Sequence, residues 1–337
     1  MTTAKSNKVI WISILRGITI TLVVMNHVRM LNPDTGGDYA LLEVFNKFLE
    51  PIRIPTFVFA SGALLYLTRI KKGWTSSNLY LDKIKHIGFP LIFCTILGCI
   101  MQIIFNGFVK TPKEVTLITP LISLIDFLHS PWPHRWYLLT LLEMMAFYPL
   151  FKHITTKSKS IALFLLLIAI YTIDFHQYSD TDWGCIFTLN KYIPFFFMGI
   201  TFFRFNLFKY FDNIYGIIVP LVSYPLLYLY IPRSELCHIL LAITGIVCMV
   251  SISIQLSKIF PNLLSSYREH IFQIYLFGIA FQAFVELILW RSLGCPKEFV
   301  YIFYLINILF GIYAPVLISK IVNQIPFKYV RLCFGLK

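Results

Sequence analysis

Residues 9–31 read VIWISILRGITITLVVMNHVRML, a long apolar run near the start of the chain. At about 1.5 Å per helical residue, the run is long enough to cross the roughly 30 Å hydrocarbon core of a bilayer. Arg16 and His27 interrupt it, unlike the short and uniform apolar core of a cleavable signal peptide. We therefore predict that this run stays in the protein as its first membrane-spanning helix.

Similar apolar runs recur along all 337 residues, of which 58% are hydrophobic and 13% are charged. Soluble chains carry roughly 25% charged residues, and no polar stretch here is long enough for a soluble domain. We predict one polytopic membrane domain over residues 1–337, an all-α integral membrane protein with about ten transmembrane helices. The expected spans cover approximately residues 9–31, 51–70, 86–108, 134–151, 159–175, 190–206, 213–231, 236–257, 270–290 and 299–320.

One apolar segment, residues 115–128, is not expected to span. It contains Pro120 and Asp126, which favour an interfacial or re-entrant piece. We also find no internal repeat, and no pair of Gly/Pro-broken helices of the kind that many secondary transporters use.

The net charge of +13 lies mainly in short loops between apolar runs, which argues against nucleic-acid binding. With a cytoplasmic N-terminus, the inner segments hold 18 Lys and Arg against three acids, and the outer loops hold eight against eleven. Cytoplasmic loops are enriched in Lys and Arg, so this asymmetry predicts that the N- and C-termini are both cytoplasmic. It also predicts location in a bacterial cytoplasmic membrane.

The seven cysteines do not show the spacing of a metal site, and we predict none. Cys185, Cys237 and Cys295 fall in expected outer loops. A disulfide among these three is left open by the sequence.

Five ionisable side chains fall inside the expected spans, where burial of charge is expensive. Arg29 and Arg53 lie near outer helix ends, from which long side chains can reach water. Arg16, Glu143 and Glu286 lie deeper and are therefore candidates for a functional site.

Arg16 and His27 form the most informative pair. They are eleven residues apart, which is about three helical turns, so they face the same side at a separation of roughly 16 Å. Either residue alone could serve only helix packing, but a cation and an imidazole on one stripe favour a site. Glu143 lies seven residues after Trp136, at a comparable expected depth. We hypothesise one polar cavity lined by Arg16, His27 and Glu143.

Two further segments carry candidate residues. Residues 53–62 read RIPTFVFASG, in which Ser61 and Gly62 would allow close helix packing. Residues 81–90 read LDKIKHIGFP, placing Lys83, Lys85 and His86 just before a span. This basic group could set topology, hold anionic lipid or bind the phosphates of a cytoplasmic cofactor.

The combination resembles membrane acyltransferase family 3, in the branch that includes fucose O-acetylases and exopolysaccharide O-acyltransferases. That family begins with an L-R-G…H helix and continues with a P-x-F-F-x-x-S-G helix, a basic segment before Pro, and a W-[FY]-L segment. In this chain Val58 replaces the second Phe of the second motif, and His86 stands where Arg is more usual. The residues that match the family pattern are Leu15, Arg16, Gly17, His27, Pro55, Phe57, Ser61, Gly62, Lys83, Lys85, Pro90, Trp136, Tyr137 and Leu138.

The resemblance implies transfer of an acyl group from cytoplasmic acyl-CoA to a sugar hydroxyl of a lipid-linked or surface glycan. Acetyl-CoA is the expected co-substrate, with succinyl-CoA as the alternative, and no tightly bound cofactor is expected. His27 would act as the base, because imidazole titrates near neutral pH. Arg16 would hold a CoA phosphate or polarise the thioester carbonyl.

The remaining candidates divide between the two substrates. Glu143 joins Arg16 and His27 in the predicted catalytic group. The donor-binding candidates are Arg16, Lys83, Lys85 and His86, and the acceptor-binding candidates are Arg53, Ser61, Trp136 and Tyr137. We expect direct transfer in a shared pore, with an acyl-His27 intermediate as the alternative.

A glycan-lipid flippase or exporter is the main competing hypothesis. It would share the polytopic form and the outer aromatic residues, but it would need no Arg–His pair and would consume no acyl-CoA. A structural or sensory membrane protein would leave the buried charges harder to explain.

Overall fold

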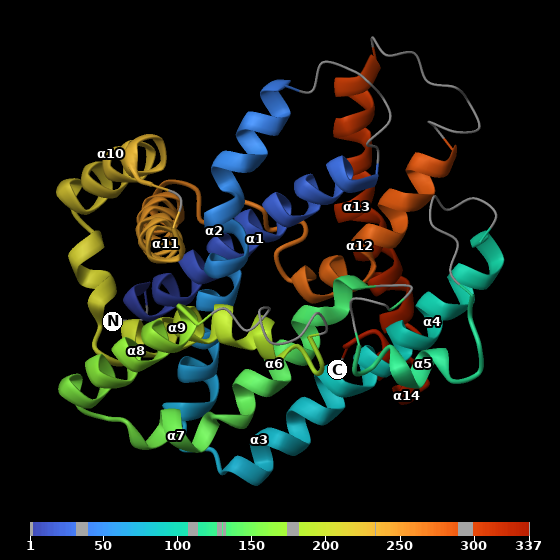
Figure 1. The fold of residues 1–337 in the computed structure, drawn as a ribbon, viewed down its shortest axis with the longest axis horizontal. Helices are drawn as coiled ribbons and strands as arrows, with labels where there is room; N and C mark the ends of the chain where they lie inside the picture. The colour runs from blue at the N-terminus through green and yellow to red at the C-terminus, as the bar shows by residue number, and fades with distance from the viewer. Residues whose placement is uncertain are drawn as a thin grey trace. The chain divides into compact units, whose positions relative to one another are not determined.

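The computed structural model describes residues 3–31, 40–106, 114–126, 130, 133–173, 182–232, 234–288 and 299–336, and these residues are mainly helical (Figure 1). They form no β-strand, only an isolated antiparallel bridge between Asp126 and Trp183. The helices are α1 (Thr3–Leu31), α2 (Ala40–Leu65), α3 (Ser76–Lys83), α4 (Phe89–Phe105), α5 (Thr119–Ile122), α6 (Trp136–Ala146), α7 (Tyr148–His153), α8 (Lys157–Tyr171), α9 (Ile186–Arg204), α10 (Ile214–Tyr230), α11 (Glu235–Ile259), α12 (Ile271–Val285), α13 (Val300–Asn323) and α14 (Lys328–Cys333).

Among the described residues, seven helical stretches are long and apolar enough to cross a membrane. These are Ile10–Val28, Leu42–Ile70, Ser76–Phe105, Ile186–Arg204, Glu235–Ile259, Ile271–Ile288 and Tyr301–Asn323. The chain is therefore a multi-pass, all-helical membrane protein, as predicted.

Three expected spans correspond to shorter helices. The segments 134–151, 159–175 and 213–231 contain α6, α8 and α10, which have 11, 15 and 17 residues. The total of ten spans and the cytoplasmic termini therefore stay predictions. Within the described part of segment 115–128, α5 has only four residues and is too short to cross, in line with the expected non-spanning piece.

Two π-helical turns flank α3 and extend spanning helices, and π-helical residues 286–288 also follow α12. The first, η1 (Tyr66–Ile70), continues α2, and the second, η2 (Ile84–Gly88), joins α3 to α4. Such turns are uncommon and frequently mark functional positions. Each of these two carries basic side chains.

The chain folds into two compact units, and the single membrane domain over residues 1–337 stays a prediction. Unit 1 comprises Met1–Leu67 and Phe195–Ile318, and unit 2 comprises Thr68–Pro194 and Ser319–Lys337. In unit 1, α1 packs against α2, α11 and α12. The buried residues Ile14, Leu15 and Ile20 line this core, and the ring of Trp11 stacks on Phe203 at 5.3 Å between centroids.

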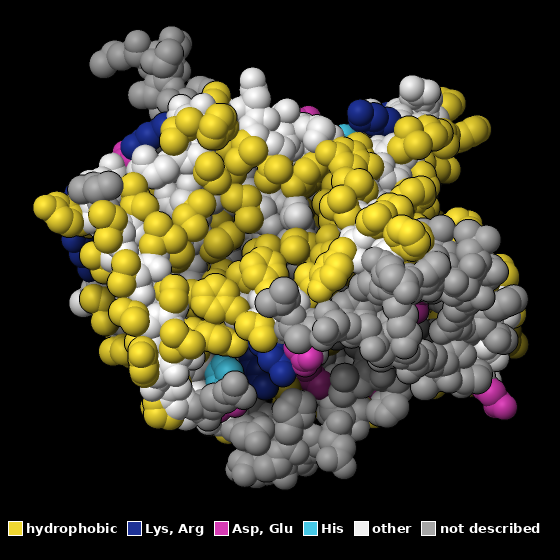
Figure 2. Space-filling view, turned by 90° about the horizontal axis from the view of Figure 1, so that it is seen from above, with side chains coloured by type: hydrophobic (Ala, Val, Ile, Leu, Met, Phe, Trp, Pro, Cys, Tyr) yellow, Lys and Arg dark blue, Asp and Glu magenta, His cyan; other side chains and the backbone are white. Residues whose placement is uncertain are grey.

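Exposed apolar side chains follow one face of several helices. On α4 they recur every three or four residues, and α13 shows the same pattern while its other face is buried. Figure 2 shows hydrophobic side chains spread over much of one face of the molecule. Large exposed apolar surfaces mark contact with lipid or protein, and here they fit a lipid-facing surface. The residues on α4 are Ile92, Ile96, Ile100 and Ile103, and those on α13 are Leu305, Leu309, Tyr313, Leu317 and Ile321.

Two glycines bring α2 and α9 into backbone contact within unit 1. A Cβ atom added at Gly62 would overlap the carbonyl oxygen of Phe196, and one added at Gly199 would overlap the carbonyl oxygen of Phe59. Small residues allow this close approach between membrane helices. The packing interpretation of the Ser61–Gly62 pair is therefore confirmed for Gly62.

We predict that Gly62→Ala destabilises the protein by about 1–3 kcal/mol or more, because the new methyl group meets rigid backbone. Thermal unfolding of the purified protein in detergent measures the loss. Gly88→Ala is the matched control, since a Cβ atom there would meet only Ile84 Cγ2 at 3.8 Å. Equal melting temperatures for the two variants would contradict the proposed close contact.

Candidate functional site

Arg16 and His27 lie on one uninterrupted helix, α1. Both side chains are partly buried, and the Nδ1 atom of His27 is enclosed. Since the helix is continuous, the eleven-residue spacing places both residues on the same side, about 16 Å apart along the axis. The continuous helix therefore puts both residues on one side of α1, whereas their roles and their depths in a membrane stay predictions.

A tight turn packs against α1 next to Arg16. A Cβ atom at Gly17 would lie 3.0 Å from Leu264 Cδ1 and 3.5 Å from Arg268 Cβ. The Thr21 and Tyr267 hydroxyls are 2.6 Å apart. Arg268 fixes the turn, because its Nη1 donates to the carbonyls of residues 261 and 263 at 2.8 and 3.0 Å. Nothing in the sequence indicates that this turn packs beside Gly17.

Arg53 on α2 is buried, with 6% exposure, rather than extended to the surface. Its Nη2 donates to the Asn46 carbonyl at 3.1 Å. It also interacts electrostatically with Tyr304, whose hydroxyl donates to the Met25 carbonyl of α1 at 3.4 Å. Arg53 therefore belongs to the same polar neighbourhood as the His27 end of α1. Snorkelling to water, which the sequence allowed for Arg53, does not occur here.

Ser61 also belongs to unit 1. Its hydroxyl donates to the Phe57 carbonyl of its own helix at 3.1 Å. Glu286, the third deep charge, is buried at the end of α12, with 7% exposure. The side chain of Arg29 lies outside the described residues.

Trp136, Tyr137 and Glu143 share helix α6 in unit 2. Trp136 stacks on Tyr192 with centroids 5.4 Å apart, and it meets Tyr137 edge-on at 5.9 Å. Tyr137 is buried, with 4% exposure. These two ring contacts hold the Trp136 side chain in place, and part of that side chain stays exposed.

Glu143 faces the turn that precedes α9. Its Oε1 lies 3.6 Å from the Cβ position of Gly184, and its buried Oε2 has no hydrogen-bond partner among the described residues. Asp182 holds the turn by accepting from the backbone N–H groups of Phe187 and Thr188 at 2.8 and 3.1 Å. Glu143 belongs to unit 2, whereas Arg16 and His27 belong to unit 1, so their shared cavity stays a hypothesis.

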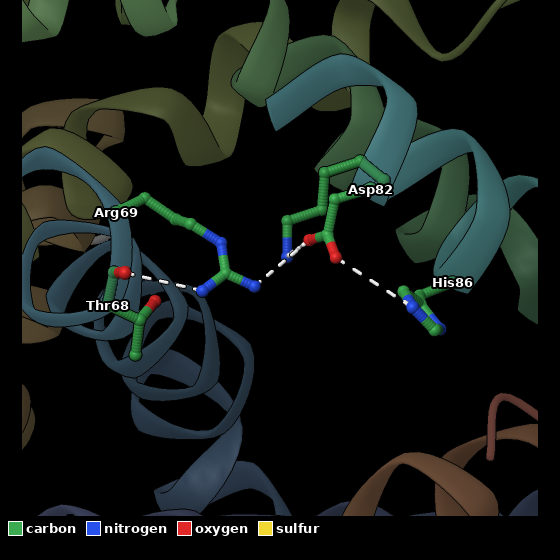
Figure 3. A network of polar contacts seen from close by, with 5 residues as sticks. Thr68, Arg69, Asp82 and His86 are labelled. Atoms are coloured by element: carbon green, nitrogen blue, oxygen red, sulfur yellow. Dashed lines mark hydrogen bonds and ion pairs between the residues drawn. The ribbon is translucent and has the colours of Figure 1, made fainter. Parts of the chain in front are cut away.

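A compact ionic group occupies the basic segment of unit 2 (Figure 3). We call Arg69, Asp82, Lys83 and His86 the Asp82 cluster. Asp82 Oδ2 lies 3.0 Å from Arg69 Nη2 and 3.5 Å from Lys83 Nζ, and its Oδ1 lies 3.8 Å from His86 Nε2. The four side chains are 17–29% exposed, and Lys85 beside them is exposed. The structure thus brings two of the three predicted donor-binding residues of this segment to one carboxylate.

Arg69 is the most constrained member of the Asp82 cluster. Its guanidinium lies over the ring of Trp74, 3.9 Å from the centroid, and its Nη1 donates to the Thr68 carbonyl at 3.3 Å. The Trp74 carbonyl accepts from Tyr148 Oη at 2.7 Å and Lys152 Nζ at 2.9 Å, which anchors the turn. Arg69 Nε is buried and finds no acceptor among the described residues.

In the sequence, Arg69 and Asp82 are only two of the charges in the predicted inner segments. The four-residue spacing from Asp82 to His86 was the one available signal, since it places both on the same helical face. Nothing in the sequence indicated the Arg69 contact, which depends on the turn between η1 and α3.

Cys185 and Cys237 are free thiols, and Cys295 lies outside the described residues. In the part of the chain that the structure describes, no group of three His, Cys, Asp or Glu side chains could hold a metal ion.

The fold is that of a multi-pass membrane protein, and several of its polar side chains are buried or partly buried. A family model described as an acyltransferase domain, that of acyltransferase family 3, matches residues 9–323. The chain belongs to this family and is an acyltransferase. No match was found among curated proteins or among solved structures. The family match favours acyl transfer over the exporter alternative.

Proposed function

We propose that this acyltransferase moves an acyl group from cytoplasmic acyl-CoA to a sugar hydroxyl of a surface polysaccharide or its lipid-linked precursor. Acetyl is the preferred group, with succinyl as the alternative. The observation that carries the proposal is the Arg16–His27 stripe on α1, within a chain of acyltransferase family 3. It supplies a cation and a base at two depths of one membrane helix.

The Asp82 cluster and Lys85 are the proposed donor-binding residues. CoA carries several phosphate groups, and Arg and Lys side chains bind phosphate through charge-assisted hydrogen bonds. The cluster supplies three basic groups against one acid, and its basic members keep part of their surface exposed. The buried Arg69 Nε–H, which lacks an acceptor among the described residues, could donate to a phosphate oxygen after a small rearrangement.

In the proposed reaction, neutral His27 accepts the proton of the sugar hydroxyl as its oxygen attacks the thioester carbonyl. A C–O bond forms and the C–S bond breaks, and His27 returns the proton to the CoA sulfur. Arg16 stabilises negative charge on the carbonyl oxygen or holds a CoA phosphate. Glu143, a partly buried carboxyl group of unit 2, remains a candidate third member of the catalytic group.

The proposed acceptor-binding residues are Trp136 and Tyr137 in unit 2 and Arg53 and Ser61 in unit 1. Trp136 offers the aromatic face, since Tyr137 and Arg53 are buried. Sugar rings stack well on aromatic faces, because their C–H groups are apolar. We place the enzyme in a bacterial cytoplasmic membrane with both termini inside, in keeping with the distribution of Lys and Arg.

We predict that His27→Ala lowers acyl transfer at least about 10²-fold while the protein level stays normal, because a general base contributes about that much or more. Release of free CoA from acetyl-CoA and succinyl-CoA, with a glycan extract as acceptor, measures the rate. The control is His238→Ala, which removes an exposed imidazole at the start of α11. Transfer retained in His27→Ala would remove the proposed base.

We predict that Lys85→Gln raises the KM for acyl-CoA about fivefold and leaves kcat nearly unchanged, because one phosphate contact is worth about 1 kcal/mol. The effect should shrink at high salt, which screens exposed charges. Lys320→Gln is the control, since this lysine is also exposed and basic but stands at the end of α13. An unchanged KM in Lys85→Gln, or an equal rise in both variants, would argue against the donor site.

A further inference from the structure

A buried amide reaches α1 from α12 at the turn that carries His27. Gln282 Nε2 donates to the Val24 carbonyl at 2.9 Å, and the Gln282 side chain is fully buried. In an α-helix the carbonyl of one residue points toward the N–H group four residues later. The amide nitrogen of Gln282 therefore lies at the level of residues 27 and 28.

A second rung extends this contact to α13. Asn307, which is 1% exposed, donates from Nδ2 to the backbone carbonyl of Gln282 at 3.3 Å. We call the chain of bonds from Asn307 through Gln282 to the Val24 carbonyl the amide ladder. Tyr304, one turn before Asn307, donates to the next α1 carbonyl, that of Met25, at 3.4 Å. Both α12 and α13 thus bond to the turn of α1 that bears His27.

The amide ladder fits between the helices because two neighbouring positions, on α12 and α13, are glycines. A Cβ atom at Gly311 would lie 2.8 Å from Gln282 Cγ and 3.0 Å from Val24 Cγ1. A Cβ atom at Gly278 would lie 2.8 Å from the Gly311 carbonyl oxygen. Larger residues at either position would push α12 and α13 apart and strain the contact with α1.

The amide ladder is a costly way to pack helices. The Gln282 Oε1 and Asn307 Oδ1 atoms are buried and have no hydrogen-bond partner among the described residues. A leucine at residue 282 would fill similar volume without burying an unsatisfied carbonyl, and interhelical hydrogen bonds in membranes give only modest stability. A requirement for stability alone would therefore not select a glutamine here.

We propose that Gln282 is a positioning residue for His27, fixing the rotation and height of the α1 turn that presents the imidazole. The inference rests on the proposed function, in which His27 is the catalytic base. Misplacing a catalytic group by about 1 Å can cost roughly a hundredfold in rate, so loss of this bond should act mainly on the chemical step.

The test is Gln282→Leu in the purified full-length protein. We expect kcat to fall at least tenfold while the KM for acetyl-CoA changes less than twofold. We also expect the NMR signals of the His27 imidazole to shift in isotope-labelled protein without substrate. Ser251→Ala is the matched control, because its hydroxyl also bonds a carbonyl of a neighbouring helix, that of Gly216 at 2.7 Å, between α11 and α10. It should leave kcat and the His27 signals unchanged.

A kcat within twofold of the parent, or a loss of the same size in Ser251→Ala, would overturn the inference. If His27→Ala stays active, the proposed function is wrong. Unshifted NMR signals of His27 in Gln282→Leu would then show, separately, that Gln282 does not position His27. If Gln282→Leu does not fold, Asn307→Leu removes the outer rung alone and is judged by the same readouts.

Discussion

The bilayer gives a buried polar group no water, so each one must find a partner within the protein or impose a cost of several kcal/mol. This constraint explains why the polar side chains of the chain gather rather than scatter. Arg53 bonds to the Asn46 carbonyl, Gln282 reaches the Val24 carbonyl, and Asp82 lies among three basic groups. Each of these groups marks a place where the fold buries polar side chains.

The same constraint distinguishes residues that serve only helix packing from residues that fit a functional site. Gly62 and Gly199 let two helix backbones touch and need no other explanation. The Asp82 cluster differs, because it joins a π-helical turn after α2 to one before α4 and leaves its cations partly exposed. A group intended only to neutralise Asp82 would need fewer cations. An excess of basic groups with open surface fits a site for an anionic donor.

Length and hydropathy were enough to predict the spanning helices, and the Arg16–His27 spacing was enough to predict a polar stripe on α1. Those features are local, so helical geometry alone determines them. The contacts that define the sites are not local. Gln282 meets a residue 258 positions earlier, and Tyr148 anchors a turn 74 positions earlier. Hydropathy also predicts spans at α6, α8 and α10, which have 11, 15 and 17 residues, so those three spans stay predictions.

We propose that the enzyme passes an acyl group from acyl-CoA to a glycan hydroxyl, with His27 as the base. The most direct measurement follows radiolabelled acetyl-CoA and succinyl-CoA through the purified protein in the presence of a native glycan extract. We expect label in the glycan as a base-labile ester, release of CoA in equal amount, and neither of these in His27→Ala. Folded protein that labels no glycan and releases no CoA from any acyl-CoA tested would contradict it.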